Sequence, residues 1–384
     1  RSMPNGDAMS LPNGWETKEI GDVLSLEYGK PLPKEKRTPN GLYPVYGANG
    51  IKDRTNEFYV EEPSIIVGRK GSAGEINYTE DKFWPLDVTY FTKFDKSELN
   101  LDFLFHLLTL LELPKLAKGV KPGINRNDVY AIKTKIPPLD EQKRIVAKLD
   151  ECFEAIDKAR ANVEKNLNNA KELFQSQLNQ IFSQKGDGWV DKILDEIGEI
   201  QTGTTPSTKD KSNYGDFIPF VKPPHFKPDG SIDAGNSMLS ESGLKIGRLF
   251  PPNSVLMVCI GATIGKTGFT ETAVSSNQQI NCLTPNENYY PKLLYYGLIS
   301  PFVQKQVADI GRGAQATLPI INKTKWQGLS INIPESKSEQ NKIVKQLDDL
   351  KSQTQSLESN YQQELDALEE LKKSVLQKAF NGEL

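Results

Sequence analysis

The chain has 384 residues, more than one hydrophobic core usually serves, so two or more domains are expected. Its hydrophobic content of 37% is low for a compact protein and favours long solvated helices with a narrow apolar seam. The net charge of -3 is not typical of a basic nucleic-acid binder, and three cysteines without CxxC spacing argue against a disulfide framework or a zinc site.

Residues 1–10 are expected to be a tag and leader, and residues 11–135 a first globular domain. Within this domain Ile66–Gly74 has the pattern of a strand that runs into a Gly-rich turn. Charge is segregated, because Lys115–Lys135 carries six basic residues and one acid, Asp128. A local basic face is therefore expected on a neutral domain.

A first long helix is predicted within residues 136–185. The Ile-Pro-Pro run at 136–138 ends the preceding strand, and apolar residues then recur at three- and four-residue steps from Ile145 to Ile181. No proline or glycine interrupts this seam. We expect a helix of roughly 44 residues, about 66 Å long.

Residues 186–332 and 333–384 repeat the same plan as a second globular domain and a second long helix. Gly188-Trp189 matches Gly14-Trp15 at an offset near 174, whereas Gln142 and Gln340 are 198 residues apart. The second globular domain should therefore be about two dozen residues longer. In mid-domain, Met257–Gly265 aligns with Ile66–Gly74.

The two apolar seams predict that the long helices pair with each other, since either helix alone would expose its seam. Chain order favours an antiparallel arrangement. The expected fold is two copies of an α/β (α+β) globular domain separated by two long antiparallel coiled-coil helices, related by a pseudo-twofold internal repeat. A plain helical hairpin or an oligomerisation coil would show the same seam, but duplication of the whole domain-plus-helix unit favours a spacer.

In these features the chain resembles the specificity subunits of type I restriction-modification systems, over residues 11–384. The resemblance is carried by Ile136–Gln142 (IPPLDEQ) with Ile145-Val146, by Leu376–Leu384 (LQKAFNGEL), and by the Gly-Trp pair that opens each domain. Tyr43–Gly50 and Phe83–Asp87 also look like recurrent segments of such domains. The second copy departs from the pattern at Ile333–Gln340, which has an extra residue and no second proline.

The resemblance implies a non-catalytic, cytoplasmic DNA-binding subunit in which each domain is a target-recognition domain for one half of a bipartite, asymmetric target. It implies two methyltransferase subunits as partners and two restriction subunits in the full complex, with no membrane. S-adenosylmethionine, ATP and Mg are then expected on those partners, with no cofactor and no metal on this chain. For docking we expect the outward faces of the long helices, with Glu141, Gln142, Glu339 and Gln340.

Alternatives are a fused restriction-methyltransferase half with its own chemistry and a non-catalytic coiled-coil adaptor. Against chemistry on this chain, no Asn/Asp-Pro-Pro-Tyr/Phe methylation motif is present, and Gly261–Thr267 is one residue short of a phosphate-binding loop. A Gly-rich turn at a strand end is expected there instead. His106, in an apolar run, is expected in the core, and His225 in an exposed loop.

Candidate DNA-binding residues are polar or basic side chains on loops, which can reach base edges or phosphates. The set in the first domain comprises Lys30, Lys34, Arg37, Tyr46, Asn49, Arg54, Arg69, Lys70, Lys121 and Arg126. The set in the second comprises Thr204, Lys222, His225, Lys266, Gln278, Gln279, Arg312 and Gln315. Arg69 and Arg312 are candidates for guanine, and the amides of Asn49, Gln278, Gln279 and Gln315 for adenine. The alternative for any one residue is a solvated charge or a turn amide.

Overall fold

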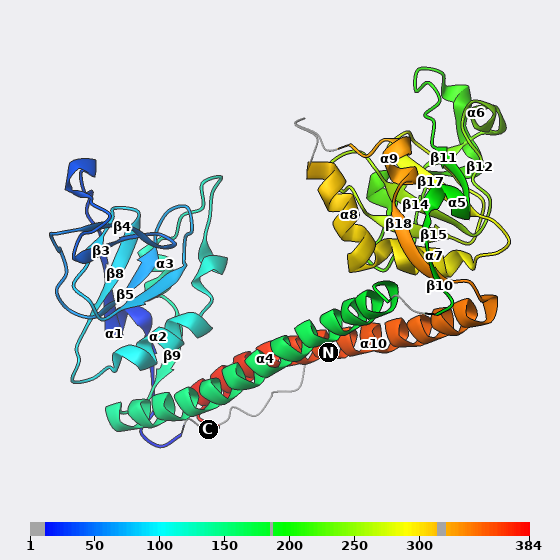
Figure 1. The fold of residues 1–384 in the computed structure, drawn as a ribbon. Coiled ribbons are helices and arrows are strands. Elements are labelled where there is room, and N and C mark those ends of the chain that lie inside the picture. The colour runs from blue at the N-terminus through cyan, green and yellow to red at the C-terminus, as the bar shows by residue number, and fades with distance from the viewer. Residues whose placement is uncertain (1–11, 185–186, 313–319) are drawn as a thin grey trace, which may run out of the picture. The chain divides into compact units, whose positions relative to one another are not determined.

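The computed structural model describes residues 12–184, 187–312 and 320–384 (Figure 1). The chain divides into two units, one comprising Arg1–Val163 with Gln363–Leu384 and the other Glu164–Gln362. Each unit holds one globular domain with a segment of helix α4 (Leu139–Phe182) and a segment of helix α10 (Lys337–Asn381). These helices have 44 and 45 residues, which confirms the predicted lengths.

The first domain has two sheets and a closing strand pair. Its four-stranded antiparallel sheet has the order β2-β8-β5-β6, formed by β2 (Leu24–Tyr28), β5 (Ser64–Gly68), β6 (Ile76–Thr79) and β8 (Thr89–Phe94). A three-stranded sheet has the order β4-β3-β7, from β3 (Tyr43–Gly47), β4 (Gly50–Thr55) and β7 (Trp84–Pro85). The closing pair is β1 (Glu16–Glu19) with β9 (Lys133–Ile136).

Short helices complete this domain. They are α1 (Ile20–Val23), η1 (Lys34–Lys36), α2 (Leu101–Leu110), η2 (Leu113–Leu116) and α3 (Arg126–Tyr130). One of them, α2, packs against both the four-stranded sheet and the long helices. The core places Val67 of β5 and Phe103 of α2 in one buried cluster with Leu149 of α4 and Phe380 of α10. The rings of Phe103 and Phe380 lie 4.9 Å apart. The long helices are therefore part of the core of this unit.

The second domain repeats this topology. Its four-stranded sheet has the order β11-β17-β14-β15, from β11 (Gly198–Thr202), β14 (Ser254–Val258), β15 (Thr267–Thr270) and β17 (Ile280–Pro285). The three-stranded sheet has the order β13-β12-β16, from β12 (Tyr214–Val221), β13 (Met238–Leu239) and β16 (Ser275–Ser276). The closing pair is β10 (Trp189–Ile193) with β18 (Ser330–Pro334). The helices are α5 (Leu194–Ile197), η3 (Lys211–Asn213), η4 (Pro223–His225), α6 (Glu241–Ile246), α7 (Pro291–Ile299), α8 (Pro301–Arg312) and α9 (Lys323–Gln327).

Backbone pairing aligns the two domains residue by residue. The amide of Gly29 donates to the Thr89 carbonyl and that of Gly203 to the Ile280 carbonyl, so β8 and β17 correspond at an offset of 191. Val67 pairs with Tyr90 and Met257 with Asn281, so β5 and β14 correspond at an offset of 190. The sequence alignment that matched Ile66 with Met257 is therefore shifted by one residue along this strand, because Ile66 corresponds to Leu256. Every residue of both strands is buried, so no polar alternation marks their register.

The extra length of the second domain lies in two places. The offset rises from 174 at Gly29 and Gly203 to 190 at Gly68 and Val258, across the segment that contains β12, β13 and α6. Most of the remainder falls where α8 stands in place of the short turn η2. The insertions therefore leave the four-stranded sheet unchanged.

The long helices pack antiparallel within each unit. In the first unit Asp157 pairs with Lys372 at 3.0 Å and Arg160 with Glu369 at 3.1 Å, so the numbering falls on one helix as it rises on the other. In the second unit the last turns of α4 share a core with the first turns of α10. The apolar seam predicted for the second long helix includes Leu357 and Leu371, and these two side chains are 39% and 47% exposed instead of buried. No helix in the described ranges has the apolar length that a membrane span needs.

Candidate nucleic-acid interface

Three turns of the first domain converge at the end of β2, where Tyr28 lies. The turn after β5 pairs with the hairpin at residues 118–123, because the Gly71 amide donates to the Pro122 carbonyl at 2.9 Å. The Ile124 amide likewise donates to the Arg69 carbonyl at 3.0 Å. Gly29 passes so close to the turn after β7 that an added Cβ would lie 2.1 Å from the Leu86 carbonyl oxygen. Backbone contacts thus hold these turns against Tyr28.

Two guanidinium groups lie over the Tyr28 ring, 5.1 Å from its centroid for Arg69 and 5.0 Å for Arg126. Each is anchored once, since Arg69 donates to the Asp87 carbonyl at 2.8 Å and Arg126 to the Leu26 carbonyl at 3.3 Å. The Tyr28 side chain remains 45% exposed. Such cation–π contacts contribute about 0.5–1 kcal/mol each at exposed sites. We call Tyr28, Arg69 and Arg126 the tyrosine–arginine site.

Tyr90 supports this site from the neighbouring strand. Its ring lies 5.1 Å from that of Tyr28, and its hydroxyl donates to the Ile124 carbonyl at 3.3 Å. Burial, reinforced by Tyr28, raises the pKa of Tyr90 above its usual value. The phenol is the donor in this hydrogen bond, and the upward shift acts in the same direction as the ordinary tyrosine pKa of about 10, which already keeps the group neutral near pH 7.

Exposed lysines surround the tyrosine–arginine site. Lys70 and Lys121 lie on the two paired turns and are exposed, whereas Lys118 is paired with Asp128 at 2.9 Å. Val120, at the tip of the hairpin, is fully exposed. Of the six basic residues between Lys115 and Lys135, only Lys121 and Arg126 lie at this site without an ion pair within the described ranges, next to Arg69 and Lys70.

Other candidates of the first domain fall into two groups. Lys30, Lys34 and Asn49 are exposed, and the Lys30 ammonium lies 4.3 Å from the centroid of the Tyr59 ring. Arg37 and Arg54 instead brace loops. Arg37 donates twice to the Leu32 carbonyl, and Arg54 donates to the Gly41 and Leu42 carbonyls.

The expectation that Tyr46 contacts DNA is corrected by its burial. The side chain is 7% exposed and packs edge-on to Phe83 in a core cluster, with ring centroids 5.8 Å apart. Composition alone does not separate a core tyrosine from a surface one, because the residue has both an apolar body and a polar tip.

In the second domain four candidates lie on the turns after β14 and β16 or just after β11: Thr204, Lys266, Gln278 and Gln279. Lys266 and Gln278 are exposed, and Gln278 accepts a hydrogen bond from Thr205. The Gln279 amide binds Asn277 at 2.8 Å, and the Thr204 hydroxyl accepts from Arg248 at 3.4 Å. Gln315 and the side chain of Arg312 lie outside the described residues.

Lys222 and His225 form a separate small motif at η4. The His225 Nδ1 accepts the Lys222 backbone amide at 3.1 Å, and both side chains are half-buried. Burial, with Lys222 as the next cause, lowers the pKa of His225. The imidazole is thus neutral near pH 7, which suits its role as an acceptor.

At the place of the tyrosine–arginine site the second domain has different side chains. Thr202 stands where Tyr28 does, Asn281 where Tyr90 does, and Cys259 where Arg69 does. The Thr202 hydroxyl contacts the Asn281 Oδ1 at 2.7 Å, and the Asn281 Nδ2 donates to the Cys259 sulfur at 3.3 Å. These three side chains therefore bond mainly to one another.

Sequence reasoning missed Tyr28, Thr202 and Asn281. A signal was available, because Tyr28 and Thr202 directly precede the repeated glycines Gly29 and Gly203. Residues beside a repeated structural glycine, but different between the copies, are candidates for divergent specificity.

The two glutamines expected on the docking surface are buried instead. Gln142 and Gln340 are both 0% exposed. The Gln142 amide binds the Asn100 amide and the Glu98 and Pro137 carbonyls at 2.8–2.9 Å. Gln340 binds the Tyr290 amide and the Asn288 and Pro334 carbonyls in the same way. These glutamine clasps tie each domain to its long helix, and only Glu141 and Glu339 stay partly exposed.

The turn at Gly261–Thr267 has no phosphate-loop geometry. It connects β14 to β15, so a strand rather than a helix follows it, and Gly261 and Gly265 have φ values of 108° and 87°. The predicted Gly-rich turn is confirmed. Among the described residues, no three His, Cys, Asp or Glu side chains gather as a metal site.

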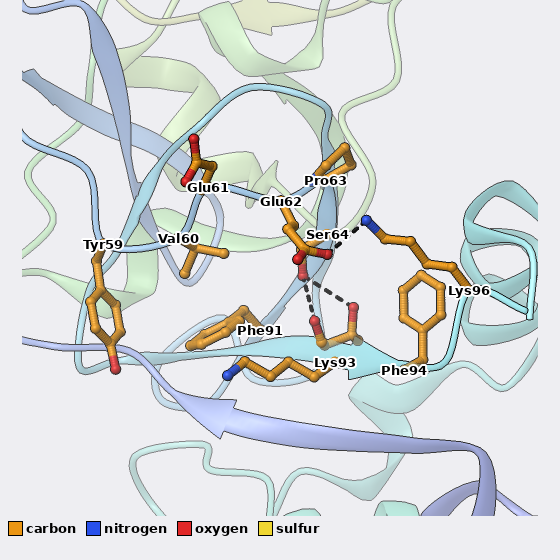
Figure 2. Close-up of a pocket in the computed structure, with 11 residues that line it drawn as sticks. Tyr59, Val60, Glu61, Glu62, Pro63, Ser64, Phe91, Lys93, Phe94 and Lys96 are labelled. Atoms are coloured by element: carbon orange, nitrogen blue, oxygen red, sulfur yellow. Dashed lines mark hydrogen bonds and ion pairs between the residues drawn. The ribbon is translucent and has the colours of Figure 1, made fainter.

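A cavity of about 460 Å³ beside β8 has no catalytic arrangement (Figure 2). Its Ser64 hydroxyl lies 2.9 Å from the Thr92 carbonyl, and Glu62 is paired with Lys96 at 2.6 Å. No histidine or cysteine is among the residues that line it. His106 lies elsewhere, half-buried with its ring 5.6 Å from that of Phe153, and burial lowers its pKa.

The chain matches the family model for the type I restriction modification DNA specificity domain over residues 12–166 and 186–367. The type I restriction enzyme HindI specificity subunit of Haemophilus influenzae is 30% identical over 51% of this chain and 42% of that subunit. The EcoDI specificity subunit of Escherichia coli is 22% identical over 98% of this chain and 90% of that subunit.

Solved structures share the fold. The HsdS subunit from Thermoanaerobacter tengcongensis has a TM-score of 0.62 at 21% identity, covering 98% of this chain and 99% of that chain. A chain from a structure that describes complex assembly and conformational transition of the type I R-M system has a TM-score of 0.77 at 22% identity, covering 97% and 99%. With two copies of the matching domain and this fold over nearly its whole length, the chain belongs to the family of type I restriction-modification DNA specificity subunits.

Proposed function

We propose that each globular domain of this chain reads one half of a bipartite, asymmetric sequence in double-stranded DNA. The observation that carries the proposal is that the turns after β5 and β7 in the first domain and after β14 and β16 in the second share backbone hydrogen bonds and differ in side chains. A common backbone lets both domains approach DNA alike, whereas different side chains present different donors and acceptors to the bases. The names of the relatives as specificity subunits support the same role.

Methyl transfer and DNA translocation belong, in this proposal, to partner subunits. Two methyltransferase subunits would bind S-adenosylmethionine, and two restriction subunits would use ATP and Mg, in the cytoplasm. The strand that follows Gly261–Thr267 supports this division, because a nucleotide phosphate loop normally leads into a helix.

The docking surface for these partners is proposed on the exposed faces of α4 and α10, with Glu141 and Glu339. Removing residues 333–384 is not a clean test of docking. This segment supplies Ile343 to one core and Phe380 to the other, so its deletion would open both. Single surface substitutions at Glu141 and Glu339 avoid that problem.

The test is methylome sequencing of a host that carries this chain together with the methyltransferase subunit encoded beside it. We expect methylated adenines in one split motif of two short halves around a fixed spacer. The control is the methyltransferase subunit alone, which should leave that motif unmethylated. The same methylation pattern with and without this chain would refute the proposal.

A further inference from the structure

We propose that the tyrosine–arginine site reads a guanine in the half-site of the first domain, and that the equivalent place in the second domain makes no such contact. The inference rests on the proposed function, since it concerns how the first domain selects its half-site. It predicts that one half of the target depends on Arg69 and Arg126 at a G·C pair, while the other half is independent of both.

The donors of the site are only partly used. The NH1 group of Arg69 donates one hydrogen bond to the Asp87 carbonyl. Its Nε and NH2 groups have no protein acceptor among the described residues. Arg126 spends one long hydrogen bond on the Leu26 carbonyl. Guanine offers two adjacent acceptors, O6 and N7, in the major groove, which match the fork of an arginine. The unused donors therefore suit guanine.

The charges of the site are also uncompensated. Neither Arg69 nor Arg126 has an ion pair within the described ranges, whereas nearby Lys118 is paired with Asp128 and Lys115 with Glu112. Two cations over one exposed ring repel each other, and an acceptor-rich partner relieves this repulsion. Lys70 and Lys121 are also without an ion pair within the described ranges, but as exposed ammonium groups they remain hydrated.

Contact with one ring favours a base edge over a phosphate as the target of these arginines. Contact with Tyr28 and one backbone anchor restrict the plane of each guanidinium, which a directional two-point contact requires. The exposed Lys70 and Lys121 have flexible side chains that suit phosphate contacts. The site thus has a rigid centre for reading and a flexible cationic rim for positioning.

The second domain lacks this arrangement at the same backbone positions. Cys259 is 2% exposed and has no donor fork, and the Thr202 and Asn281 side chains contact each other. A cation does stand where Arg126 does, because Lys323 begins α9 as Arg126 begins α3. A lysine there can approach a phosphate or a base, but it lacks the planar two-point fork.

The experiment uses the assembled methyltransferase and a plasmid library in which every position of its mapped motif carries each of the four bases. Arg69→Ala and Arg126→Ala should each reduce discrimination at a G·C pair of one half by about 10- to 100-fold, with the other half unchanged. Arg69→Gln should shift preference at its position toward A·T, because glutamine pairs with adenine. Lys96→Ala, which removes an exposed cation already paired with Glu62, is the matched control and should change nothing.

Arg69→Lys is a second variant for the case in which the alanine variants lose all methylation, so that base discrimination can still be measured. It keeps the charge and loses the fork, so methylation should persist with relaxed choice at the same base pair. The inference would be overturned if Arg69→Ala and Arg126→Ala still discriminated the G·C pair as well as the unchanged chain does. If the alanine variants are inactive, the same result with Arg69→Lys would overturn it. A half-site of A·T pairs alone would also overturn it. In both cases the split motif itself would remain, so failure here is distinct from failure of the proposed function.

Discussion

The two globular domains are alike where each joins its long helix and differ in the side chains at the ends of β2 and β11. Gln142 and Gln340 occupy equivalent buried positions and bind the same three kinds of backbone group. In contrast, Tyr28, Tyr90 and Arg69 are replaced by Thr202, Asn281 and Cys259. The same side-chain-to-backbone bonds therefore hold both domains to their helices, whereas the side chains on the turns differ between the domains.

The largest expected effect is on the free energy of unfolding, and it comes from exchanging the residue types at Arg69 and Cys259. Cys259→Arg would place a cation in a core where burial raises the pKa of the thiol to about 12. We expect destabilisation of at least about 3 kcal/mol, because the new charge has no partner there. The reverse change, Arg69→Cys, loses one anchor and a cation–π contact and should cost about 1 kcal/mol or less.

Urea unfolding of both variants checks this asymmetry, with hydrogen exchange to assign the loss to a unit. Equal destabilisation by Cys259→Arg and Arg69→Cys would show that the two positions are packed alike, contrary to the structure. Cys259→Ser is the control, since it keeps the size of the side chain.

The glutamine clasps give the next effect, and it should be the same in both domains. Gln142→Ala and Gln340→Ala each remove three hydrogen bonds from buried or partly buried backbone groups. We expect each to lower the free energy of unfolding by about 3 kcal/mol. Hydrogen exchange should show the loss in the first unit for Gln142→Ala and in the second for Gln340→Ala.

Glu141→Ala and Glu339→Ala serve as matched controls for the clasps. Each glutamate is partly exposed and pairs with a neighbour three residues along its helix, Arg144 or Lys342. Exposed pairs of this kind contribute less than about 1 kcal/mol. Loss of stability from the glutamates and none from the glutamines would contradict the assignment of the clasps.

The smallest expected effect is on DNA affinity, and it concerns one exposed lysine on the turn after β5 and one on the turn after β14. Lys70→Ala and Lys266→Ala remove exposed cations from the two domains. Each should weaken binding of the assembled methyltransferase to target DNA a few-fold and lower the slope of log affinity against log salt by about 1. Fluorescence anisotropy over a salt series measures both quantities. A change with one lysine only would mean that the domains approach DNA differently.

Much of the architecture was determined by the sequence itself. Offsets of 174 and 198 reveal the duplication, and unbroken apolar seams predict both long helices, because helical periodicity and capping are local properties. DNA recognition came from resemblance to a family, since no local motif encodes it. Arg69, Lys70, Lys121 and Arg126 were named from the sequence as separate candidates, and only Arg69 and Lys70 were grouped there.

Only the tertiary structure decided which of these side chains face solvent and which bond inward. Tyr46 and both glutamines lie in cores, Arg37 and Arg54 brace loops, and Tyr28 becomes the centre of the site. The register of β5 against β14 was likewise open, because both strands are buried on both faces. These outcomes depend on contacts between residues up to about a hundred positions apart, such as Arg126 with Leu26, and local patterns do not carry that information.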